Sequence, residues 1–312
     1  AGGEWVSPAI AVAKDLENGR GRGLVLKSPV SALDVLIVAE AFVVAPLQDL
    51  HAATLRLLAD ESVDPRRRAQ FLVLSDGTGT LSDIEIDLYR TGPVPAPGDV
   101  DEARVKRILQ VNGRHLGPSA PSDSDSSPVQ AGDAKKPRSE RESSGVWLLP
   151  SLLNHSCAPT TGFIYLDNKY VCIFAARDLR AGDELTDSYV DIFCPRRQRL
   201  KELHEQKGFT CACSRCEKEK MLPDLVVNRT LDRQFNADLR LRKEGSGGVA
   251  QWAEEVKGVR DAIDKAVGST MKSQGHEEDE AFLRAAFLEA ELVAVRTLFA
   301  ITGKDASPPP LC

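Results

Sequence analysis

The spacing of the cysteines constrains this chain more than any other feature of its sequence. Cys211, Cys213 and Cys216 form a compact Cys-x-Cys-x-x-Cys pattern. Three thiolates are one short of the tetrahedral set that a structural zinc ion takes. Cys157, far earlier in the chain, can supply the fourth. We therefore predict that the fold brings two distant stretches together around one ion.

The residues just before Cys157 form a second unusual pattern. Residues 154–157 read Asn-His-Ser-Cys and follow the apolar run 149–153. An amide, an imidazole, a hydroxyl and a thiol in succession do not suit a plain core strand, because every buried polar group needs a partner. On local grounds alone, His155 is more simply a hydrogen-bonded core histidine.

Composition excludes some classes of function. The 312 residues suffice for two domains or one elaborated domain, and 42% hydrophobic with 28% charged residues is typical of a soluble globular protein. The formal net charge of −6 argues against a nucleic-acid partner, because phosphate binding needs a basic face. It is compatible with an acidic groove for a basic peptide. Since there is no membrane-length apolar run and no secretory signal, we expect no membrane partner and an intracellular location.

The apolar periodicity predicts a mixture of strands and helices. Strands are expected over 6–12, 24–27 and 33–44, and a hairpin over 162–175 with its turn at 167–168. Helices are expected over 48–60, 65–74, 99–111, 196–206, 249–267 and 278–301. The stretch 118–144 is rich in Ser, Asp, Pro and Lys and nearly lacks large apolar residues, so we expect it to be disordered.

Two further motifs complete the pattern. Residues 19–24 read Gly-Arg-Gly-Arg-Gly-Leu, and glycines at alternate positions allow positive φ and close approach of a ligand to the backbone. On local grounds alone, a hairpin turn is the plainer interpretation of this stretch. Residues 183–189 read Asp-Glu-Leu-Thr-Asp-Ser-Tyr and end at Tyr189.

Taken together, these motifs resemble those of SET-domain protein lysine methyltransferases. Residues 19–24 resemble the family's opening glycine motif, and residues 154–159 resemble its central motif. Residues 183–189 resemble the motif with the catalytic tyrosine, and 208–216 the post-SET zinc segment. Four motifs in the family's order are highly specific. The insertion and the helical tail are similar to the SMYD-like branch, although residues 50–110 contain no cysteine for its MYND finger.

The resemblance implies an α+β fold, with a β-rich SET domain that contains a β-clip and a pseudoknot. Residues 1–50 are expected to form the N-terminal part of this domain, 51–110 a mainly helical insertion, and 111–206 the C-terminal part. The disordered insertion 118–144 interrupts that last part. A post-SET zinc segment over 207–220 and an α-helical C-terminal region over 221–312 follow.

The resemblance also implies two cofactors, S-adenosylmethionine and a structural zinc ion. The zinc ligands are the four thiols Cys157, Cys211, Cys213 and Cys216. The residues implied in binding S-adenosylmethionine are Arg20, Gly21, Arg22, Asn154, His155 and Phe209. Tyr189 is the implied catalytic residue, and we expect it to orient the amine and to act electrostatically. A phenol has a pKa of about 10, which makes it an imperfect general base near neutrality.

The leading hypothesis is therefore a protein-lysine N-methyltransferase that acts on a histone or another protein, in the nucleus or the cytoplasm. The alternative is a catalytically silent SET protein that serves as an interaction module, with the C-terminal helices as its docking surface. Thr160 and Arg114, which depart from the family's usual Asn and Phe, favour the alternative. The intact Asn154, His155 and Tyr189 favour the enzyme.

Overall fold

The computed structural model describes residues 4–16, 21–78, 89, 92–94, 100–116, 143–167, 169–192, 194–220, 261 and 265. The chain divides into two compact units, 1–154 with 163–185 and 155–162 with 186–312. Nearly all of the predicted disordered insertion and of the predicted C-terminal helices lies outside the described residues, as do Arg20 and Cys312. No helix in the described ranges is long and apolar enough to cross a membrane.

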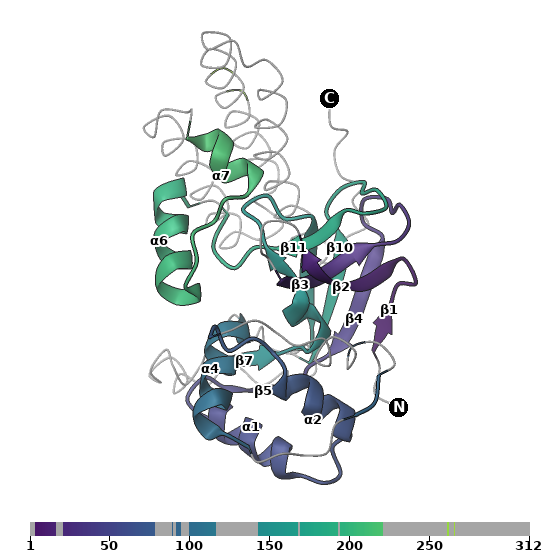
Figure 1. Ribbon diagram of the computed structural model, residues 1–312, viewed down its shortest axis with the longest axis vertical. Coiled ribbons are helices and arrows are strands. Elements are labelled where there is room, and N and C mark those ends of the chain that lie inside the picture. Colours follow the sequence, from purple (N-terminus) through teal and green to yellow (C-terminus); the bar gives the residue numbers. More distant parts are fainter. Residues whose placement is uncertain are drawn as a thin grey trace, which may run out of the picture. The chain divides into compact units, whose positions relative to one another are not determined.

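One core of the first unit contains residues of two four-stranded sheets, and the first of these sheets is built around β4 and β10 (Figure 1). Its strands, in the order β1-β4-β10-β9, are β1 (Trp5–Val6), β4 (Val35–Glu40), β10 (Tyr170–Ala175) and β9 (Thr161–Leu166). The β9–β10 hairpin predicted from alternating apolar residues is present, and Asp167 in its turn has φ 51°. Leu36 and Ile37 of β4 are fully buried in this core.

A second sheet contains the predicted glycine motif. Its order is β2-β3-β11-β8, with β2 (Ile10–Leu16), β3 (Gly21–Leu26), β11 (Glu184–Asp187) and β8 (Asn154–His155). The 3₁₀ helix η3 (Leu149–Leu152) precedes β8. Gly23 in β3 has no room for a side chain, because a Cβ there would lie 2.9 Å from Nδ2 of Asn154. Glycine at this position therefore lets the amide of Asn154 approach the β3 backbone.

The helical part of the first unit surrounds a small sheet, β5-β7-β6, formed by β5 (Val43–Pro46), β7 (Ser143–Val146) and β6 (Arg114–Leu116) (Figure 1). The helices are α1 (Leu50–Ala59), α2 (Pro65–Leu72) and α4 (Glu102–Asn112). The carboxylates of Asp64 and Asp101 accept backbone N–H groups at the starts of α2 and α4, as N-caps do. Phe42 and Phe71 stack in this second core, with ring centroids 4.9 Å apart.

Two of the predicted strands are wrong in detail, because each is two strands. The apolar run 33–44 contains β4 and β5, which belong to different sheets. The chain changes sheets at Ala41 and Phe42, where Phe42 N donates to Val146 O at 2.8 Å and Arg67 donates to Ala41 O at 3.2 Å. The predicted strand 6–12 is likewise split, into β1 and β2.

Within residues 194–220, the second unit contains the helices α6 (Arg196–Lys207) and α7 (Ser214–Glu219) (Figure 1). The helix α6 ends at Gly208, whose φ of 76° is in the left-handed region that glycine adopts without strain. The chain then continues through Phe209 to the cysteine cluster. Leu203 of α6 packs on four buried cysteine side chains, so the core that the described residues of this unit form is built around sulfur.

Candidate functional site

Four cysteine thiols meet in the second unit. The Sγ atoms of Cys157, Cys211, Cys213 and Cys216 all lie within 4.8 Å of one another, and all four residues are buried. Cys157 Sγ is 4.0 Å from Cys211 Sγ and 3.4 Å from Cys216 Sγ. Tetrahedral zinc with Zn–S bonds of about 2.3 Å sets its sulfurs about 3.8 Å apart. The thiols that the sequence predicts to meet do meet, and their spacing fits a structural zinc ion.

The elements around the cluster explain its geometry. Cys157 directly follows β8, and Ser156 N donates to Asp187 O at 2.9 Å, which fixes this stretch on β11. Cys211 and Cys213 lie in the extended segment after α6, where Cys213 N donates to Cys211 Sγ at 3.4 Å. Cys216 is in the first turn of α7. The set has four protein ligands and so leaves no open position for a water molecule, which is typical of a structural site.

The thiols affect one another's protonation. Hydrogen bonding to Cys211, and then to Cys213 and Cys216, lowers the pKa of Cys157. The hydrogen bond to Cys157 raises the pKa of Cys211 and of Cys216. A cation that binds here displaces their protons, so its binding is coupled to proton release.

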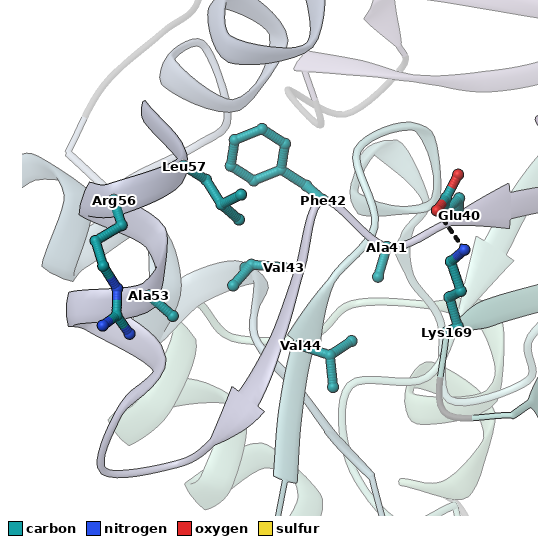
Figure 2. Close-up of a pocket in the computed structure, with 9 residues that line it drawn as sticks. All are labelled: Glu40, Ala41, Phe42, Val43, Val44, Ala53, Arg56, Leu57 and Lys169. Carbon is teal, nitrogen blue, oxygen red and sulfur yellow. Dashed lines mark ion pairs between the residues drawn. The ribbon is translucent and has the colours of Figure 1, made fainter. Parts of the chain in front are cut away.

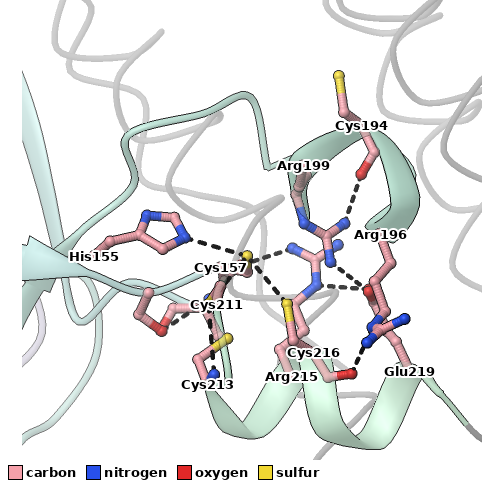
Figure 3. A network of polar contacts seen from close by, with 12 residues as sticks. His155, Cys157, Cys194, Arg196, Arg199, Cys211, Cys213, Arg215, Cys216 and Glu219 are labelled. Carbon is pink, nitrogen blue, oxygen red and sulfur yellow. Dashed lines mark hydrogen bonds and ion pairs between the residues drawn. The ribbon is translucent and has the colours of Figure 1, made fainter. Parts of the chain in front are cut away.

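A buried ionic network borders the cluster, and sequence reasoning missed it. Glu219 lies between two buried guanidinium groups: it pairs with Arg199 through Oε2, and with Arg215 through Oε1 at 2.8 Å (Figure 3). Arg215 Nη1 donates to Cys157 O at 2.8 Å, and Arg196 Nε donates to Cys216 O at 2.8 Å. The two buried guanidinium groups and the one carboxylate leave a net positive charge beside the cysteine cluster. The Arg215–Glu219 spacing of i,i+4 was the available sequence signal.

Removing the shared carboxylate is expected to destabilise the protein strongly. Glu219→Gln keeps the shape of the side chain but leaves the Arg199 and Arg215 guanidinium groups without their anion in a dry environment. We expect the free energy of unfolding of the zinc-loaded protein to fall by about 3–5 kcal/mol, measured by urea denaturation.

The matched control is Glu217→Gln on the same helix. Its carboxylate pairs with Lys220 at the surface, where the two side chains are 48% and 50% exposed. This variant should change the free energy of unfolding by at most about 0.5 kcal/mol. Equal effects of the two variants would contradict a structural role for the network.

His155 connects the cysteine cluster to Tyr189. Its Nδ1 is 3.0 Å from Tyr189 N, and its Nε2 is 3.3 Å from Cys157 Sγ. Figure 3 shows the imidazole pointing at Cys157. The ring also packs against Tyr189 and Phe209, at centroid distances of 5.3 and 5.9 Å. Lys207 Nζ lies 5.6 Å from the Tyr189 ring centroid. The predicted catalytic tyrosine and two predicted cofactor residues are thus neighbours.

The other predicted cofactor residues belong to the first unit. Asn154 Nδ2 donates to Arg22 O at 2.9 Å and to Glu184 Oε1 at 2.8 Å. Arg22 is buried, and its Nη1 donates to Val73 O at 2.8 Å. Because the Asn154 amide group donates internally, its oxygen is the side-chain atom that it can offer a ligand. Gly21 opens β3 with φ 69°, and Arg20 lies outside the described residues.

The two departures from the family pattern serve packing. Thr160 and Thr186 exchange hydrogen bonds, from Thr160 N to Thr186 Oγ1 at 3.1 Å and from Thr186 N to Thr160 Oγ1 at 2.8 Å. In the first unit, the Arg114 guanidinium lies 5.5 Å from the Phe163 ring centroid and Nη2 donates to Pro150 O at 3.4 Å. Each side chain therefore has a structural role in its own unit.

The first unit also has a cleft of about 400 Å³ (Figure 2). Its lining is mostly apolar, with Phe42, Val43 and Leu57 among the lining residues, and Lys169 pairs with Glu40 at 2.9 Å on one side. None of the residues predicted to bind zinc or the cofactor lines it. The cleft does not extend the candidate site.

The chain matches one known protein family over much of its length. A family described as "SET domain" matches residues 21–190, which is more than half of the sequence. The chain belongs to the SET-domain family. The matched part of this SET domain includes Asn154, His155, Cys157 and Tyr189, and it ends before the Cys211–Cys216 segment.

Relatives of this SET-domain chain carry names of lysine methyltransferases. It is 35% identical over 91 residues to "Histone-lysine N-methyltransferase SET5" of Vanderwaltozyma polyspora, covering 29% of this chain and 18% of the relative. It is 36% identical over 90 residues to "Histone-lysine N-methyltransferase SMYD3" of Homo sapiens, covering 28% and 21%. It is 32% identical over 103 residues to "Protein-lysine N-trimethyltransferase SMYD5" of Gallus gallus, covering 31% and 24%. The matches therefore span about a fifth of each relative's length.

Among solved structures, "Crystal structure of the SET domain of LSMT bound to MeLysine and AdoHcy" covers 96% of this chain and 88% of that one. The identity is 11% and the TM-score 0.34, a likeness too slight to bear on the fold or the function.

Proposed function

We propose that this chain is an S-adenosylmethionine-dependent protein-lysine N-methyltransferase. The observation that carries the proposal is the place of Tyr189: it lies inside the SET-domain match, next to His155, and packs on the buried four-cysteine cluster. The names of the relatives, histone-lysine and protein-lysine N-methyltransferases, support the same reaction class. The substrate is a protein with a target lysine, histone or other.

S-adenosylmethionine, when bound, supplies a methyl group on a positively charged sulfur. A new bond forms between the lysine nitrogen and the methyl carbon, the bond from that carbon to sulfur breaks, and the nitrogen's extra proton passes to solvent. The amine must be neutral and in line with the carbon–sulfur bond, so positioning supplies much of the rate. We assign Tyr189 to this positioning, with its hydroxyl directed at the amine. Gly21, Arg22, Asn154, His155 and Phe209, with Arg20, are the proposed cofactor contacts.

The four-cysteine cluster is proposed to hold zinc for a structural purpose. Cys157 directly follows the Asn154–His155 strand, whereas the other three ligands follow α6. An ion bound by all four ties these two stretches together, and Phe209 lies between α6 and the first of the three. The chemistry of methyl transfer needs nothing from the ion itself.

The proposal includes the division of the chain predicted from sequence. In it, residues 1–50 and 111–206 form the SET domain, 51–110 its helical insertion, and 207–220 the zinc segment. The region 221–312 is proposed to be helical and to dock a protein partner. We also propose that the protein acts inside the cell, in the nucleus or the cytoplasm, where such a protein substrate occurs.

The direct test is transfer of a labelled methyl group. The zinc-loaded chain is incubated with S-adenosylmethionine carrying a tritiated methyl group and a protein extract, and labelled bands are analysed by mass spectrometry. We expect label on lysine side chains, and its loss when the product S-adenosylhomocysteine is added in excess. Cofactor binding by calorimetry without label in any protein would contradict the enzyme and favour the silent interaction module.

A further inference from the structure

The imidazole of His155 makes a polar contact on each side. Nδ1 lies 3.0 Å from the main-chain nitrogen of Tyr189, and Nε2 lies 3.3 Å from Sγ of Cys157. The residue is 6% exposed and the cysteine is fully buried. Both contacts are therefore shielded from water. Loss of either one would leave a buried polar group without a hydrogen bond, which costs free energy.

The contact with Tyr189 determines where the ring proton is. A backbone N–H can only donate, so Nδ1 must accept and cannot carry a proton. A neutral imidazole has one proton, and here it must be on Nε2. That proton then points at the sulfur of Cys157, which accepts it.

We propose that His155 is a positioning residue that couples the metal site to the main chain of Tyr189. The Nε2–H group holds the Cys157 sulfur in its orientation as a ligand, as groups that hydrogen-bond to metal ligands do. Nδ1 holds the backbone N–H of Tyr189. The rigid imidazole ring therefore links Cys157, a proposed zinc ligand, to Tyr189, the residue that we assign to orienting the lysine amine. Loss of the ion therefore releases Tyr189 as well as the cysteine segments.

The surroundings of the ring make this coupling stiff. The Tyr189 and Phe209 rings both pack on the imidazole, at centroid distances of 5.3 and 5.9 Å. The Tyr189 ring also packs on the cysteine cluster. Rotation of the imidazole would therefore disturb two aromatic contacts and both hydrogen bonds at once.

The first test is the position of the proton in the unmodified protein. The zinc-loaded chain is labelled with ¹⁵N-histidine, and long-range ¹H–¹⁵N spectra at neutral pH are assigned by comparison with a variant. We expect the tautomer of His155 with the proton on Nε2 and an accepting Nδ1. A proton on Nδ1 would overturn the proposal without any variant having to fold.

Two variants of His155 each remove one of its two contacts and keep the other. In His155→Asn, Oδ1 takes the place of Nδ1 and can still accept from Tyr189 N, but no donor reaches Cys157. In His155→Gln, the side-chain amide takes the place of Nε2 and can donate to the sulfur, but the acceptor that Nδ1 gave to Tyr189 N is lost. The exposed His204 on α6 supplies the control, His204→Asn.

The rate of zinc release to a chelating dye is the main measurement. We expect release about 10–100-fold faster in His155→Asn and close to the parent rate in His155→Gln and His204→Asn. Equal rates in the two His155 variants would overturn the coupling, since a ring that only fills space would not distinguish them.

A second measurement rests on the proposed function. With zinc in excess, kcat for methyl transfer should be lower in His155→Gln, which lacks the hold on Tyr189, than in His155→Asn, which keeps it. The opposite order would overturn the coupling. If no variant or parent transfers a methyl group, the proposed function fails, whereas the proton position and the zinc release still decide the role of His155.

Discussion

Cys213→Ser is expected to remove the bound zinc ion and to unfold the segment that contains Cys211–Cys216. A hydroxyl is a poor ligand beside three thiolates, and tight binding needs the complete set of soft donors. The free energy of zinc binding to structural sites, about 10–16 kcal/mol, is also folding free energy. Metal analysis should find one zinc per parent chain and close to none in the variant, and this segment should become open to proteolysis.

The matched control is Cys194→Ser in the same unit. Cys194 is half-buried and outside the four-thiol cluster, and burial, with Asp191 and Glu202, raises the pKa of its thiol to about 11. This variant should keep its zinc. Full zinc content in Cys213→Ser, or no zinc in the parent, would refute the metal site. The cores of the first unit consist of that unit's own residues, so its β-sheet signal should persist in both variants.

Tyr189→Phe is expected to lower kcat for methyl transfer by about 10²-fold while leaving zinc and cofactor binding almost unchanged. The magnitude is that of losing one oriented polar group at the reacting centre. The substitution is informative because the ring of Tyr189 packs on His155 and on the cysteine cluster, and Phe retains that ring. Any loss of activity is then due to the hydroxyl.

The control for this variant is Tyr170→Phe in β10. Tyr170 is also half-buried, and its ring lies 5.1 Å from Lys169 Nζ, a contact that Phe retains. It should transfer methyl groups at the parent rate. Parent-like kcat in Tyr189→Phe would remove Tyr189 from the reaction. A fall in its zinc content would instead indicate that the hydroxyl is structural.

The convergence of the thiols could be predicted from sequence because metal chemistry demands a fourth ligand. The helices α1, α2 and α4 also follow from apolar spacing and from Pro65 at the start of its helix. The split of the apolar run 33–44 could not be predicted, because neither Gly nor Pro interrupts it between Leu33 and Val44.

The burial and the partners of the polar groups around the site could not be predicted from the sequence either. Arg199 occurs among the charged residues of a basic helix, a pattern usually typical of a solvated surface, yet it is fully buried. The donors of Asn154 reach a backbone carbonyl and Glu184, and a carbonyl has no signature in the sequence. Such partners are set by tertiary packing alone.

The short helix α7 carries a cation, a proposed zinc ligand and an anion at Arg215, Cys216 and Glu219. Each residue turns an α-helix by about 100°, so inserting one residue after Cys216 would swing the carboxylate away from both guanidinium groups. The length of this helix is therefore as fixed as its chemistry. Protein engineers who insert tags or linkers here should leave residues 211–219 intact.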